Sequence, residues 1–144
     1  MRRALLLVLC GSLLAAGAAQ PRPQTAQAEG RFLSVDVVVD SGDAALAAWQ
    51  VEITDRSGRA RVVGVEGGEH PAFQEPPYYD PAALQRGRIV LAAFHLGAQL
   101  PRGRTRVARV HLLSTDAEPE LQIVPVTAAT EGGRRIDIRT ELQR

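Results

Sequence analysis

Apolar and polar residues alternate along much of this chain, with the period of two that is typical of strands with one buried face. Two segments show the pattern most clearly, and their apolar faces hold Leu33, Val35, Val37 and Val39 in the first and Ala47, Trp49, Val51 and Ile53 in the second. Trp49 is the only tryptophan of the chain, and we expect it to be the largest residue of the core.

Further strands are predicted at residues 60–65, 88–94, 105–114, 121–126 and 135–139. Turn-forming residues separate them at 40–43, 55–58 and 131–134, and Pro125 suggests a sheet edge or a bulge. Segment 88–94 is apolar almost throughout, so we expect it to be central or covered on both faces. Strict alternation in 105–114 puts Arg106 and Arg109 on opposite faces. Seven or more strands without helical periodicity predict an all-β sandwich.

A long irregular segment, residues 62–81, interrupts this series of strands. It contains Gly67-Gly68, four prolines and three of the five Phe and Tyr residues of the chain, Phe73, Tyr78 and Tyr79. Asp80 and Pro81 predict one short helical turn up to Leu84, with Asp80 as its N-cap. Loops of this kind on a rigid β scaffold often carry function.

The N-terminus has the three parts of a secretory signal: Arg2-Arg3, an apolar run at 4–14, and small residues up to Ala19. We therefore divide the chain into a signal peptide at 1–19, a flexible polar leader at 20–30 and one domain at 31–144. The alternative is an uncleaved N-terminal anchor. Cys10 is the only cysteine and lies in the signal, so a cleaved chain has no disulfide and no thiol nucleophile.

The charge and the polar residues restrict the classes of function. A formal net charge of +1 argues against a nucleic-acid binder that relies on bulk charge. An arginine stripe at Arg102, Arg104, Arg106 and Arg109 offers a contact for an acidic partner or polysaccharide, although a solvated strand edge has the same pattern. We expect no enzyme, because no nucleophile motif is present and nothing selects a catalytic pair among the 16 acids.

Two places in the sequence carry residues that could bind a metal. Glu66, Glu69 and His70 suggest a metal or acid–base cluster, but the neighbouring Gly and Pro residues forbid the helical turn of the usual zinc motifs. A solvated loop is the simpler interpretation. Four aspartates offer oxygen ligands for calcium, namely Asp36, Asp40, Asp43 and Asp55, although residues 40–43 also read as an ordinary turn. We expect no cofactor, with calcium left open.

The order of motifs resembles that of cohesin domains. The resemblance rests on Val35 to Val39, the strand around Trp49, Val62-Val63-Gly64-Val65 leading into a loop, residues 87–94, and the glycine before the long strand at 104–112. It covers residues 32–142 and implies a jelly-roll β-sandwich, related to carbohydrate-binding modules, that docks a dockerin partner. The chain departs from the pattern where Asp55-Arg56-Ser57-Gly58 replaces a Tyr-Asp-Pro, and in the proline-rich loop.

Together these features predict a secreted, extracytoplasmic, non-catalytic binding module, in the periplasm or at the cell surface. We expect protein–protein docking through a sandwich face or the 66–81 loop, with polysaccharide binding as the alternative. Coplanar exposed aromatics would favour sugar, and a mixed apolar and charged sheet face would favour protein. The candidate contact residues are Glu69, His70, Phe73, Tyr78 and Tyr79. Because 78 and 79 are neighbours, one of the two tyrosines is expected to face inward.

The signal segment yields a direct prediction. Protein exported by its native host should begin close to residue 20, because the apolar run is of signal length and ends in an alanine-rich cleavage box. N-terminal sequencing of the exported protein measures this. A start at Met1 would contradict secretion by cleavage.

Overall fold

The computed structural model describes residues 30–115 and 118–144. The predicted signal peptide and nearly all of the predicted leader lie outside the described residues. The described elements are β1 (Arg31–Asp40), β2 (Ala48–Asp55), β3 (Ala60–Gly67), the 3-10 turns η1 (Pro71–Phe73) and η2 (Pro81–Ala83), β4 (Arg88–Phe94), β5 (Arg104–Ser114), β6 (Leu121–Ala129) and β7 (Arg139–Gln143).

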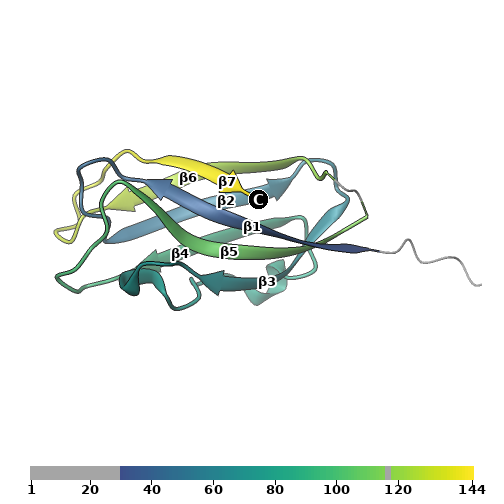
Figure 1. The fold of residues 1–144 in the computed structure, drawn as a ribbon, viewed down its shortest axis with the longest axis horizontal. Coiled ribbons are helices and arrows are strands. Elements are labelled where there is room, and N and C mark those ends of the chain that lie inside the picture. The colour runs from purple at the N-terminus through teal and green to yellow at the C-terminus, as the bar shows by residue number, and fades with distance from the viewer. Residues whose placement is uncertain (1–29, 116–117) are drawn as a thin grey trace, which may run out of the picture.

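The strands form two antiparallel sheets that pack face to face (Figure 1). The four-stranded sheet has the order β3-β5-β1-β7, and the three-stranded sheet has the order β4-β2-β6. The predicted all-β sandwich is thereby confirmed, as is the helical turn near Asp80, which caps η2 by accepting a hydrogen bond from the Ala82 N–H at 2.9 Å.

The core lies between the two sheets and is built by the predicted apolar faces. Val35, Val37 and Val39 of β1 are at most 1% exposed, and Trp49 of β2 is 2% exposed. Trp49 packs against Phe73, which comes from the long loop between β3 and β4. The burial predicted for Trp49 is therefore confirmed, and the loop contributes to the core beside it.

The predicted turns are held by their aspartates. Asp40 accepts a hydrogen bond from the Gly42 N–H at 3.0 Å, and Gly42 has a φ of 57°, a conformation that favours glycine. Asp55 is 8% exposed. Its carboxylate accepts from the N–H groups of Ala60, Ser57 and Arg59, and from the Ser57 hydroxyl. Burial raises the pKa of Asp55, but these hydrogen bonds outweigh it and hold the pKa below its usual value.

One prediction about the long strand was wrong, because a bulge changes its alternation. The pairing of β1 with β5 shifts register between Val37 and Val38, and β5 has two successive buried residues at Val107 and Ala108. A bulge adds one residue to a strand, so side chains beyond it change face. Arg106 and Arg109 consequently lie on the same outer face, although strict alternation had separated them.

The C-terminal part follows the prediction only in part. Pro125 lies on β6, which is a sheet edge, and the pairing with β2 shifts register beside it, so both expected features occur there. The hairpin turn at 130–134 forms, with the Gly133 N–H bonded to the Thr130 carbonyl at 2.9 Å. The returning segment then makes a single bridge, Ala129 with Arg135, before the chain crosses to the other sheet as β7.

Candidate functional site

The loop at residues 66–81 is fixed to the sandwich from its first residues onward. A Cβ atom on Gly67 would stand 1.8 Å from the Gln74 carbonyl oxygen, and one on Gly68 would stand 2.4 Å from the Arg106 carbonyl oxygen. Glu69 then binds β5 twice: its N–H donates to the Arg106 carbonyl at 3.0 Å, and its carboxylate accepts from the Arg106 N–H at 3.1 Å. The two glycines are therefore required by close backbone approach.

The middle of the loop is structural as well. His70 caps η1 by accepting a hydrogen bond from the Ala72 N–H at its Nδ1 atom, at 3.2 Å. Phe73 is only 2% exposed, and its ring meets Trp49 edge-on, with centroids 6.1 Å apart and planes at 79°. Of the predicted contact residues, Phe73 is thus a core residue, which a ligand on the surface does not reach. Glu69 and His70 lie at the surface but have structural hydrogen bonds.

The two tyrosines face opposite ways, as their neighbouring positions predicted. Tyr79 is half-buried and packs on the core, whereas the side chain of Tyr78 is 69% exposed. The backbone of Tyr78 pairs with Ala92 at the edge of β4 through two hydrogen bonds, of 2.7 and 3.0 Å. Tyr78 is therefore held in a fixed place while its ring projects into solvent.

Phe94 is a surface residue that the sequence prediction missed. We expected residues 88–94 to be central or covered on both faces, and this was wrong, because β4 is the edge strand of its sheet. Phe94 is 59% exposed, and its ring lies nearly parallel to that of Tyr78, at 12°, with centroids 6.0 Å apart. The charged Arg88 was the available signal: period two places it on the same face as Phe94, which marks that face as exposed.

Tyr78 and Phe94 border the outer face of the three-stranded sheet, here called the aromatic face. Strand register places small and uncharged side chains beside them: Ala92, Gln50 and Thr127 in one row, and Ala48 and Ala129 in the next. Further along the strands, the Arg88 guanidinium donates two hydrogen bonds to Glu52, at 2.9 and 2.7 Å. These bonds lower the pKa of Glu52. The aromatic face thus combines an apolar part with one ion pair.

The outer face of the four-stranded sheet is different, because most of its charges are paired. The cations are Arg104, Arg106, Arg109 and Arg139, and their acidic partners are Glu141, Asp36 and Asp40. Arg109 forms two hydrogen bonds with Asp36, at 2.7 and 3.1 Å, and they hold the pKa of that carboxyl below its usual value. Arg102, the fourth member of the predicted stripe, donates to the Asp43 carbonyl. The arginine stripe is therefore largely neutralised by its own neighbours.

His111 links two further strands on this face. Its Nε2 atom lies 2.8 Å from a Glu66 carboxylate oxygen on β3, and its Nδ1 atom lies 2.9 Å from the Ser34 hydroxyl on β1. Among the described residues, no three His, Cys, Asp or Glu side chains gather in a way that could hold a metal ion. The four aspartates considered for calcium include Asp36 and Asp40, which pair with arginines, and Asp55, which bonds within its own turn.

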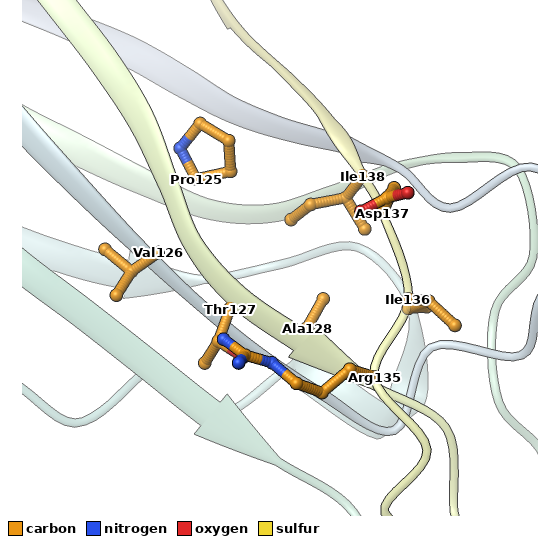
Figure 2. Close-up of a pocket in the computed structure, with 8 residues that line it drawn as sticks. All are labelled: Pro125, Val126, Thr127, Ala128, Arg135, Ile136, Asp137 and Ile138. Atoms are coloured by element: carbon orange, nitrogen blue, oxygen red, sulfur yellow. The ribbon is translucent and has the colours of Figure 1, made fainter.

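A shallow pocket of about 420 Å³ opens where the chain crosses between the sheets. It is lined by Pro125 to Ala128 of β6 and by Arg135, Ile136, Asp137 and Ile138 of the crossing segment (Figure 2). The two isoleucines are half-buried and pack on the core, so they close this side of the sandwich. No convergent set of polar side chains marks the pocket as a reaction site.

No protein-family model, curated protein or solved structure matches this chain. Within the part of the chain that the structure describes, no helix has the length and apolar character needed to cross a membrane. The class that can be stated from the fold is that of an all-β sandwich, and its most exposed rigid aromatic pair is on the aromatic face.

The close approach at Gly67 gives a test of how the loop is attached. Gly67→Ala should lower the free energy of unfolding by about 2 kcal/mol or more, since its Cβ must displace the backbone at Gln74. Gly132→Ala is the matched control: its Cβ meets nothing within 4 Å, so the change should stay within about 0.5 kcal/mol. Denaturant titration measures both. Equal, small effects would contradict a tightly seated loop.

Proposed function

We propose that this chain is a secreted, non-catalytic binding module that docks a protein partner through the aromatic face. One observation carries the proposal: Tyr78 and Phe94 are largely exposed and lie side by side on rigid backbone. Large aromatic side chains are the residues that most often dominate binding energy at protein interfaces. The signal-like residues 1–19 support an extracytoplasmic location, at the cell surface or in the periplasm.

Rigidity favours these two residues as anchors. Tyr78 is bonded to β4 by two backbone hydrogen bonds, and Phe94 is the last residue of β4 itself. Tyr and Phe side chains have only two rotatable angles, so immobilising them on binding costs little entropy. A partner that covers these rings gains apolar contact without having to order a mobile loop.

The composition of the face favours a protein partner. Its apolar part consists of the two rings with Ala92, Ala48 and Ala129, and the Arg88–Glu52 pair lies beyond it along the strands. Apolar contacts bordered by polar groups are the usual composition of protein interfaces. The resemblance to cohesin domains points to the same class of partner, a small docking domain.

The other predicted contact regions support the proposal less well. Glu69 and His70 form hydrogen bonds within the fold, and Phe73 is buried. The outer face of the four-stranded sheet carries arginines whose charges are already compensated. A partner that binds there must compete with existing ion pairs, whereas the rings of Tyr78 and Phe94 are largely exposed and stack on each other.

A polysaccharide is the second candidate ligand, and the ring geometry favours it. The planes of Tyr78 and Phe94 differ by only 12°, and the amide of Gln50 and the hydroxyl of Thr127 lie in the next strand positions. Nearly parallel rings offer π faces to the C–H groups of sugar rings, and amide and hydroxyl groups can bind sugar hydroxyls.

The proposal predicts that the double change Tyr78→Ala with Phe94→Ala lowers partner capture by about ten-fold or more, equivalent to about 1.4 kcal/mol. The thermal midpoint should change little, because both side chains are exposed. Capture is measured by immobilising the exported protein and quantifying the host surface and secreted proteins that it retains. Retention on insoluble polysaccharides is measured in parallel.

Phe32→Ala is the matched control, since it removes a phenylalanine that is 73% exposed on the other sheet. Its capture of proteins should stay at the level of the unmodified chain. Equal losses for the control and the double variant would contradict the proposal. If only polysaccharide retention falls in the double variant, the second candidate replaces the first.

A further inference from the structure

The arginines of the described residues fall into two groups, those with a side-chain partner and those without, and Arg59, in the turn between β2 and β3, belongs with the first. Those with a side-chain hydrogen bond or ion pair to a carboxylate or carbonyl are Arg88, Arg102, Arg104, Arg106, Arg109, Arg139 and Arg144. Within the described residues, no such side-chain partner occurs for Arg31, Arg56, Arg61, Arg86, Arg134 and Arg135. All six are exposed. Arg134 and Arg135 lie in and directly after the hairpin turn at 130–134. The other four lie elsewhere.

Those four arginines gather at one end of the sandwich. Arg31 begins β1 opposite Ser114, and Ser114 in turn lies opposite Ala60, the neighbour of Arg61. Arg56 lies in the turn between β2 and β3, and its N–H bonds to the Glu120 carbonyl. Arg86 bonds through its carbonyl to the Val62 N–H at 2.8 Å. We call this group, Arg31, Arg56, Arg61 and Arg86, the arginine end.

Acidic side chains do not compensate the arginine end in the way they do on the sheet face. Asp55 is buried and its carboxylate bonds within its turn, and Glu118 pairs with Arg144. Among the described residues of this end, Glu120 is the remaining exposed carboxylate. Four unpaired guanidinium groups therefore give this end a local positive potential, although the whole chain carries a formal charge of only +1.

An exposed aromatic side chain accompanies these charges. Phe32 is 73% exposed and lies opposite Leu113, which in turn lies opposite Arg61. Arg61 on β3 and Phe32 on β1 therefore lie in one row, with β5 between them, and both side chains are on the outer face of the four-stranded sheet. Arginine with an exposed aromatic residue is the combination that suits the interface between water and an anionic lipid leaflet.

We propose that the arginine end docks on an anionic membrane surface, with the guanidinium groups on lipid phosphates and Phe32 at the headgroup boundary. Arg31 and Phe32 open β1, which begins at this end of the sandwich (Figure 1). The aromatic face, on the other sheet, stays available to a partner, so the two surfaces act independently.

Vesicle co-sedimentation of the exported protein tests the proposal. The vesicles contain phosphatidylcholine alone, or phosphatidylcholine with phosphatidylglycerol, at low and at high salt. Binding is expected to the anionic vesicles and should weaken as salt screens the charges. Arg31→Glu with Arg61→Glu should lower partitioning onto anionic vesicles by about ten-fold or more. Phe32→Ala should reduce the binding that remains at high salt.

Arg134→Glu with Arg135→Glu is the matched control. It changes the net charge equally, but at the hairpin that follows β6. That hairpin lies at the end of the sandwich opposite to the start of β1. Its partitioning should stay within about two-fold of the unmodified chain, because those arginines are farther from the leaflet than the screening length of about 10 Å. Thermal midpoints show whether each variant is folded. If the Glu variants do not fold, Arg56→Gln with Arg86→Gln replaces them, with a several-fold loss expected.

Three results would overturn the proposal. The first is no preference for anionic vesicles, and the second is an equal loss in the variant pair and in the control pair. The third is arginine-dependent binding to soluble dextran sulfate without vesicle binding, which would assign the arginine end to a soluble polyanion. None of these results depends on whether Tyr78 and Phe94 bind a partner.

Discussion

The edge-on contact between Trp49 and Phe73 is the interaction on which the arrangement of the long loop depends. Trp49 is the largest buried side chain of β2, and its indole N–H has no hydrogen-bond partner among the described residues. Trp49 is therefore stabilised at this position by packing, and part of that packing comes from Phe73. With Phe73 held in the core, the following residues are led to the edge of β4, where Tyr78 pairs with Ala92.

The two sheets use their outer faces in opposite ways. On the four-stranded sheet, arginines and acids from neighbouring strands form exposed ion pairs, which contribute little to stability because solvent screens them. The larger effect of this pairing is on recognition, because it leaves little free charge on the part of the face away from the arginine end. On the three-stranded sheet the outer face keeps two exposed rings and several alanines, which favours contact with another molecule.

Much of the fold was readable from the alternation of residues, because each predicted strand has one face in the core. Trp49 and the valines of β1 are buried as that pattern requires. The irregularity beside Pro125 was readable from the proline, but the bulge in β5 was not, since it depends on how two strands pair, and it moved Arg106 beside Arg109. The prediction that one of Tyr78 and Tyr79 faces inward was correct. The burial of Phe73 could not be predicted, because it depends on a contact with Trp49, which is far away in the sequence. Phe94 was missed because an apolar run suggested a central strand.

Amide hydrogen exchange of the loop tests most directly the claim that a core contact makes it rigid. The N–H groups of Gly68, Glu69 and Tyr78 bond to the carbonyls of Phe73, Arg106 and Ala92. These three amides should exchange as slowly as amides within β4, because opening them requires removal of Phe73 from the core. Exchange as fast as at the exposed Gly132 of the hairpin would contradict it, and would make Tyr78 part of a mobile segment.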